Sequence, residues 1–198
     1  YMAIGSETSN PNIHQLIISG QIYNMGYVKL YSSTAGYGLQ VEPGGSIYTL
    51  AGRNLQIYYY GIAGPLVNHG VITGEVPFTI FMHNADKEIS FGDVRTTVDV
   101  RTTSPTRSNV LTVTGGDIDR LRVRASDSTS YTNTVDLAGN SIVAGIVSVE
   151  KRGIIGNGTI RTMSWDSTAG TILDGTSLIL SDGGTVKLAP GQSFNKLY

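Results

Sequence analysis

Hydrophobic and polar residues alternate over many short stretches of this chain. Tyr27, Lys29 and Tyr31, for example, fall on one side of an extended strand, while Val28 and Leu30 fall on the other. A period of two is typical of half-buried β-strands, and no segment keeps the spacing of three and four that a helix requires. We therefore predict an all-β protein with strands over residues 13–19, 27–31, 46–50, 55–60, 76–83, 89–91, 96–102, 110–114, 121–125, 142–149, 159–165, 177–180 and 186–188.

Turn residues separate these strands at intervals of roughly 8–15 residues. The clearest are Gly44-Gly45, Gly115-Gly116, Asn157-Gly158 and Asp182-Gly183-Gly184. Pairs of this type favour two-residue hairpins between antiparallel strands. The pattern predicts antiparallel sandwich or jelly-roll-like units.

Segments 41–50 and 188–197 align without a gap. Each has an apolar residue, then Pro-Gly, then Ser two residues after the Gly, and each ends on Leu. Pro fixes φ at the first turn position and Gly supplies a positive φ at the next, which predicts a type II turn. The residues concerned are Pro43, Gly44 and Ser46 in the first copy and Pro190, Gly191 and Ser193 in the second.

This repeat predicts two small β units, over residues 1–75 and 76–198. The first copy is followed by a strong strand at 55–60, whereas the chain stops directly after the second copy. An unpaired sheet edge is prone to pair with another strand. Segment 1–12 is a candidate donor strand for such an edge in a neighbouring subunit.

Composition excludes several classes of protein. The chain has 198 residues, a formal charge of −1 and no cysteine. It is therefore not strongly basic as a nucleic-acid binder would be, and it has no disulfide, thiol nucleophile or thiolate metal site. It has no apolar run long enough to predict a membrane span. Its first residue, Tyr1, fits a processed chain or a fragment.

Catalytic motifs are absent from the sequence. It has neither a phosphate-binding Gly-x4-Gly-Lys-Ser/Thr loop nor a Gly-x-Ser-x-Gly nucleophile elbow. His14, His69 and His83 stand apart, without the spacing of metal ligands. We expect no enzyme activity, no cofactor and no metal site.

Two polar clusters have alternative interpretations. Asp117 and Asp119, with Asp127 nearby, could bind calcium or form a polar turn. The stretch 157–159 reads Asn-Gly-Thr, which is a glycosylation acceptor but also a typical Asn-Gly turn. The turn is the interpretation that we favour in both cases.

Two groups of residues are candidate interfaces. Arg122 and Arg124 share one face of a strand, which is either a solvated face or a basic stripe for an anionic partner; neighbouring aspartates favour salt bridges at a contact surface. Tyr58, Tyr59 and Tyr60 are consecutive, and tyrosine is favoured at interfaces because its stiff side chain offers a large amphipathic surface.

The region 13–71 resembles small β-domains in structural proteins of tailed phages and related viruses. The shared features are an apolar strand at 16–18, Asn-x-Gly-x-Val at 24–28, a Gly-containing turn at 35–39, apolar-x-Pro-Gly-x-Ser at 41–46, and Asn-Leu at 54–55 with a glycine at 61. The resemblance implies a protein that decorates a capsid or builds a tail or spike.

We therefore expect a structural virion component whose partners are copies of itself and other structural proteins, without nucleic acid. The alternative is a subunit of an extracellular filament assembled by strand donation. A third possibility is a carbohydrate-binding module, with Tyr48 and 58–60 as stacking platforms.

Overall fold

The computed structural model describes residues 2–4, 15–23, 26–32, 38–61, 66–83, 86–102, 106–125 and 130–198. These residues form strands joined by turns, and none of them forms a helix that could cross a membrane. The strands are β1 (Met2–Ile4), β2 (Gln15–Ile18), β3 (Gln21–Tyr23), β4 (Gly26–Ser32), β5 (Gly38–Val41), β6 (Ser46–Thr49), β7 (Leu55–Gly61), β8 (Leu66–Asn68), β9 (Val71–Gly74), β10 (Phe78–His83), β11 (Asp86–Thr102), β12 (Asn109–Val123), β13 (Asn133–Asp136), β14 (Ser141–Val149), β15 (Gly153–Gly156), β16 (Thr159–Asp166), β17 (Thr171–Leu173), β18 (Ser177–Lys187) and β19 (Lys196–Leu197).

The strands stack in three parallel ladders. The first ladder runs β1-β4-β7-β10 and continues through the C-terminal parts of β11, β12, β14, β16 and β18. The second runs β2-β5-β8, the N-terminal parts of β11 and β12, then β13-β15-β17. The third runs β3-β6-β9, the middle of β11 and β12, the N-terminal parts of β14, β16 and β18, then β19.

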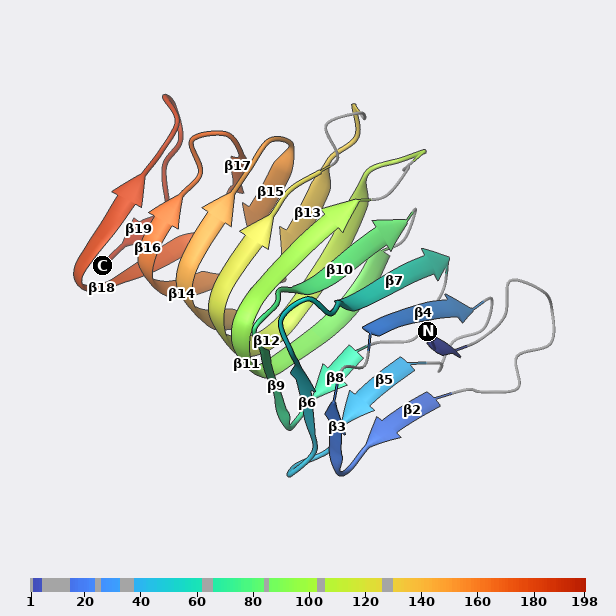
Figure 1. The fold of residues 1–198 in the computed structure, drawn as a ribbon. Coiled ribbons are helices and arrows are strands. Elements are labelled where there is room, and N and C mark those ends of the chain that lie inside the picture. Colours follow the sequence, from blue (N-terminus) through green and yellow to red (C-terminus); the bar gives the residue numbers. More distant parts are fainter. Residues whose placement is uncertain are drawn as a thin grey trace.

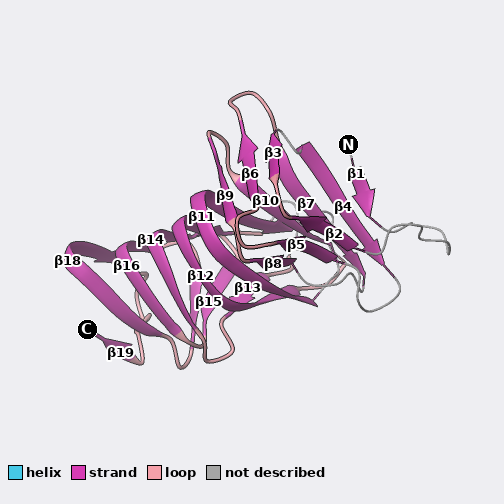
Figure 2. Cartoon of the chain, turned by 90° about the horizontal axis from the view of Figure 1, so that it is seen from below, coloured by secondary structure: helices cyan, strands magenta, loops and turns pink. Residues whose placement is uncertain are grey.

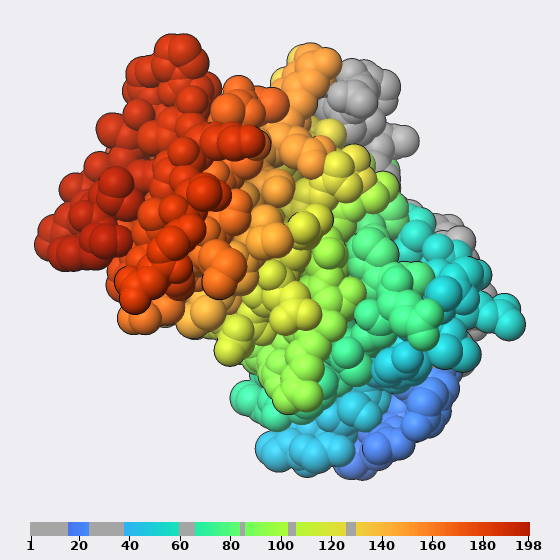
Figure 3. Space-filling model, turned by 60° about the vertical axis from the view of Figure 1, so that its left-hand side comes forward, coloured from blue at the N-terminus to red at the C-terminus, as the bar shows by residue number. Residues whose placement is uncertain are grey.

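The chain contributes one strand to each of the three ladders in order and then returns to the first ladder, where its next strand stacks on the strand of the preceding turn. It forms a single parallel β-solenoid of about seven turns. In Figure 1 the colours run in sequence order along the stack, with the N and C termini at opposite ends. Figure 2 shows the same stack from below, and in Figure 3 the successive turns form neighbouring bands on the surface. Such an architecture is quasi-one-dimensional, because each turn contacts mainly the turns before and after it.

The core is built from columns of apolar side chains at equivalent positions of successive turns. In the first ladder one column contains residues 55, 78, 98, 121, 147 and 165, which are Leu, Phe, Val, Leu, Val and Trp, all at most 1% exposed. The period-two pattern of the sequence places these side chains inside and their neighbours outside. The alternation therefore determines which side of each strand lines the solenoid.

A column of glycines marks the corner between the second and third ladders in the first five turns. Its members are Gly20, Gly45, Gly70, Gly92 and Gly116. A Cβ on Gly45 would lie 2.2 Å from the carbonyl oxygen of Ile18, and one on Gly70 would lie 2.1 Å from that of Gly45. At Gly45 and Gly70 the stacked corners approach so closely that a side chain does not fit.

The predicted antiparallel sandwich or jelly-roll fold is wrong, although the all-β class is right. Every described pairing is parallel, and the predicted hairpin turns do not join paired strands. Gly44-Gly45 and Asn157-Gly158 are corners between strands of different ladders, whereas 115–116 and 182–184 lie within β12 and β18. A solenoid corner needs the same tight backbone turn as a hairpin, so turn residues alone do not distinguish a solenoid from an antiparallel fold.

Both Pro-Gly pairs form turns. The amide of Gly45 donates to the carbonyl of Glu42 and that of Gln192 to Ala189, with positive φ values of 84° at Gly44 and 82° at Gly191. They occupy different corners, however. Segment 41–46 leads from the second ladder to the third, whereas 188–193 follows the part of β18 in the first ladder.

The structure crosses the predicted unit boundary at residues 75 and 76 without an interruption of the first ladder, because β7 pairs with β10. Of the proposed donor segment 1–12, the structure describes only β1. This strand pairs in parallel with β4 of the same chain, with Met2 opposite Val28.

Candidate functional site: a tyrosine shelf on the third ladder

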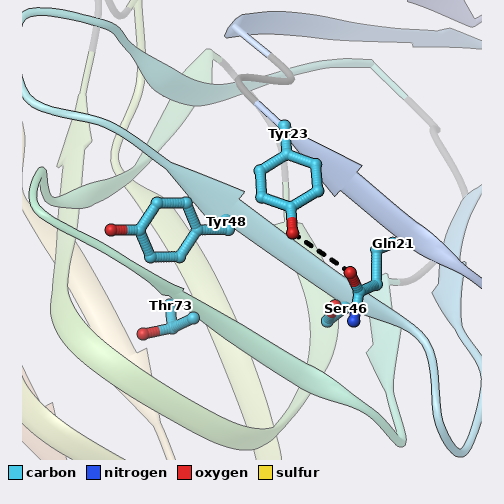
Figure 4. Close-up of a pocket in the computed structure, with 5 residues that line it drawn as sticks. All are labelled: Gln21, Tyr23, Ser46, Tyr48 and Thr73. Atoms are coloured by element: carbon cyan, nitrogen blue, oxygen red, sulfur yellow. Dashed lines mark hydrogen bonds between the residues drawn. The ribbon is translucent and has the colours of Figure 1, made fainter.

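A hollow of about 330 Å³ lies on the outer side of the third ladder in the first three turns. It is lined by Gln21 and Tyr23 of β3, Ser46 and Tyr48 of β6, and Thr73 of β9 (Figure 4). We call these five residues the tyrosine shelf. Its volume is at the lower end of the range typical of small-molecule sites.

The register of the third ladder creates this shelf. Tyr23, Tyr48 and Thr73 occupy one outward row, and the alternate residues Ile47 and Ile72 point into the core. Adjacent parallel strands lie about 4.8 Å apart, so equivalent side chains of successive turns are neighbours in space. Residues 25 positions apart in sequence therefore form a continuous surface.

The two tyrosine rings form a tilted pair. Their centroids are 6.0 Å apart and their planes meet at 60°. The Tyr23 hydroxyl donates to Oε1 of Gln21 over 3.1 Å, as Figure 4 shows, and the Tyr48 hydroxyl donates to Oε1 of Glu75 over 3.1 Å. This bond and the charge of Glu75 raise the pKa of Tyr48, so that Tyr48 remains a neutral phenol at physiological pH.

The shelf combines an exposed aromatic surface with polar groups. Tyr23 is 65% exposed, a large fraction for an aromatic residue within a strand. The Gln21 carboxamide, the hydroxyls of Ser46 and Thr73, and the Glu75 carboxylate surround the rings with both donors and acceptors. Such a surface can stack against a ligand that is apolar on one side and hydroxylated at its edge.

The predicted tyrosine interface is not one surface. Tyr59 is fully buried, because it shares the inward parity of Leu55 and Ile57, and so it cannot present a platform to a partner. Tyr58 points outward, is half-buried, and stacks on Phe81 with a centroid distance of 4.5 Å. The side chain of Tyr60 lies outside the described residues.

The predicted arginine pair lies on the outer side of the first ladder, away from the tyrosine shelf. Arg122 pairs with Glu150, and Arg124 pairs with Asp99 at 3.0 Å. The mixed charges predict salt bridges at a contact surface. The ion pairs of the structure lie within the chain, so the contact surface stays a prediction. Arg122 lines a second hollow, which is described below, and Arg124 pairs with Asp99 of the same hollow.

The other polar candidates are dispersed. Asp117 and Asp119 lie on β12, and Asp127 falls outside the described residues, among which no group of three potential metal ligands occurs. Asn157 has a φ of 58° and donates to Asp136 Oδ1 over 2.9 Å, as expected for a residue in a tight corner.

The sequence interpretation included Tyr48 but missed Tyr23, Gln21 and Glu75. A signal was present, since Gly20-Gln-Ile-Tyr23 and Gly45-Ser-Ile-Tyr48 share the pattern Gly-x-Ile-Tyr. This repeat places two tyrosines at equivalent positions of adjacent turns once the fold is known to be a solenoid.

No protein-family model, no curated protein and no solved structure matches this chain.

Proposed function

We propose that this protein is a carbohydrate-binding solenoid and that the tyrosine shelf is its binding site. The observation that carries this proposal is the tilted Tyr23–Tyr48 pair, which lies beside three polar side chains in one hollow. A sugar ring has an apolar face of C–H groups and a rim of hydroxyls. The phenol rings match the face, and Gln21, Ser46 and Thr73 match the rim.

The charge of the shelf favours a neutral saccharide. Glu75 is the carboxylate beside Tyr48, and it accepts a hydrogen bond from that hydroxyl. Arg95, next to Thr73 in the same row, is paired with Asp93 at 2.8 Å. The nearby cation is therefore neutralised, whereas Glu75 keeps its negative charge and would repel an acidic sugar.

A glycan array of neutral and acidic oligosaccharides identifies the ligand, and titration calorimetry then measures its affinity for variants. Tyr23→Ala removes the exposed ring, and we expect about a tenfold loss of affinity, which corresponds to about 1.4 kcal/mol. Tyr198→Ala is the matched control, because Tyr198 is 68% exposed and lies at the other end of the solenoid. This control should bind as the wild type does.

An array without any bound glycan would refute the proposal. So would binding that Tyr23→Ala and Tyr48→Ala leave unchanged, since the ligand would then lie elsewhere. The virion role, expected from the turn motifs, and the filament role, expected from the first residue and the unpaired edge of the second unit, stay predictions. A glycan-binding surface is compatible with either.

A further inference from the structure

A second hollow, of about 310 Å³, lies on the outer side of the first ladder in the middle turns. It is lined by residues from consecutive turns: Pro77, Thr97, Asp99, Arg101, Arg120, Arg122, Ser148 and Glu150. The register places Thr97 beside Arg120, and it aligns Asp99, Arg122 and Ser148 in one outward row. We call this site the arginine hollow.

Ion pairs hold three guanidinium groups in place, those of Arg101, Arg122 and Arg124. Asp99 is only 1% exposed, although it is on the outer side, because arginines cover it. It accepts a hydrogen bond from Nε of Arg101 at 2.7 Å and two from Arg124, at 3.2 Å from Nε and 3.0 Å from Nη2. Glu150 accepts a hydrogen bond from Nε of Arg122. These side chains have therefore lost their rotational freedom before any ligand arrives, which favours binding.

The arginine hollow, taken together with Arg124, which pairs with Asp99, has more positive than negative groups. Four guanidinium groups (Arg101, Arg120, Arg122 and Arg124) face two carboxylates (Asp99 and Glu150), so two positive charges remain in excess. Arg120 is exposed and forms no ion pair with the residues that the structure describes. Asp119, which precedes Arg120 in the sequence, interacts electrostatically with Arg95 in the third ladder.

We propose that the arginine hollow binds a compact anionic group, a phosphate, sulfate or carboxylate. Arg120 and Arg122 supply planar guanidinium donors, which suit the paired oxygens of such groups. The hydroxyls of Thr97 and Ser148 line the same hollow and add neutral donors. The anion can be a free ion or a group carried by an acidic glycan. This site does not depend on the tyrosine shelf, which lies on another ladder and favours neutral ligands.

The test is an NMR titration of the isotope-labelled full chain at constant ionic strength. One arm adds inorganic phosphate and the other adds a short oligosaccharide of uronic acids. We expect saturable shifts of the amides of Thr97, Arg120 and Ser148 in at least one arm. Saturation by phosphate assigns the site to a free anion, whereas saturation by the oligosaccharide alone assigns it to an acidic glycan.

Arg120→Gln is the decisive variant, because Arg120 is exposed and outside the ion-pair network. The substitution therefore leaves the ion pairs to Asp99 and Glu150 in place. We expect at least a tenfold weaker affinity with an unchanged thermal melting curve. Arg161→Gln, an exposed arginine on β16 in the third ladder, is the matched control and should bind normally. The absence of saturable shifts in both arms, or equal affinities of Arg120→Gln and the wild type, would overturn the proposal.

Discussion

Replacement of Gly70 by alanine tests the stacked corner on which the solenoid depends. The backbone of Gly70 is not in the left-handed region, so an alanine is acceptable on conformational grounds. Its Cβ, however, would lie 2.1 Å from the carbonyl oxygen of Gly45, 2.7 Å from that of Glu42 and 2.8 Å from Cγ1 of Val41. Gly20 is the matched position one turn before Gly45, and a Cβ there meets no atom within 4 Å.

The magnitude follows from the displacement that the methyl group requires. Contacts shorter than 3.0 Å do not persist, so the corner at Gly45 must move by about 1 Å. The Gly45 carbonyl also accepts the hydrogen bond of the Val71 amide at 3.1 Å, which this movement strains. Overpacking and a weakened hydrogen bond together cost about 2–4 kcal/mol. Alanine also lowers the conformational entropy of the unfolded chain, which offsets about 0.4–1 kcal/mol of this cost. At Gly20 this stabilising contribution is the whole effect of the substitution.

Urea denaturation followed by circular dichroism measures both variants. We expect Gly70→Ala to lower the free energy of unfolding by about 2–3 kcal/mol, which lowers Tm by roughly 4–12 °C for a chain of this length. Gly20→Ala should be neutral or slightly stabilising. Equal stabilities of Gly70→Ala and Gly20→Ala would show that the turns do not stack at this corner, and the described register would be wrong.

Two further predictions concern buried polar groups. Burial lowers the pKa of Lys87 to about 8, from an ordinary value of 10.5, so the folded protein binds fewer protons than the unfolded chain between these values and its stability increases from pH 8 to 10.5. Lys87→Met should therefore stabilise the protein at pH 7 by about 1–2 kcal/mol, after allowance for solvent screening. This gain in stability should shrink as the pH rises. Urea denaturation that finds the same gain at pH 7 and at pH 10.5 would contradict the lowered pKa of Lys87. The Tyr59 hydroxyl is buried without a hydrogen-bond partner among the described residues, so Tyr59→Phe should leave the stability unchanged or raise it by up to about 1 kcal/mol, and a loss above 1 kcal/mol would reveal a missed partner.

Local pattern predicted the strands well but not how they pair. Each of the thirteen predicted segments overlaps a strand of the structure, whereas short strands such as β8, β13 and β17 were missed. Strands of three or four residues contain too few alternations for a period to be visible. Parallel pairing was missed because the partner of a residue lies a whole turn away, as Leu55 and Phe78 do, whereas a hairpin partner is close in sequence.

The glycine column was the signal that could have revealed the solenoid. Glycine, any residue, then Ile or Val occurs at 20–22, 45–47, 70–72, 92–94 and 116–118, with intervals close to one another. The alignment of segments 41–50 and 188–197 predicts two related units instead, although the two Pro-Gly turns occupy different corners of the solenoid. A recurrence of period 20–50 residues points to a repeat architecture even when its individual copies are weak.

The candidate sites could be predicted only in part, because each combines residues from several turns. Parity alone would have placed Tyr59 inside, since Leu55 and Ile57 on the same side of β7 are apolar and Gln56 on the other side is polar. Which outward residues become neighbours depends instead on the register and on the number of residues in each turn. The loops between strands vary in length, so no fixed offset in sequence links Asp99 to Arg122 and Ser148. A loop insertion that preserves the corners would therefore leave both sites intact, whereas a shift of one residue within a strand would exchange its inner and outer side chains.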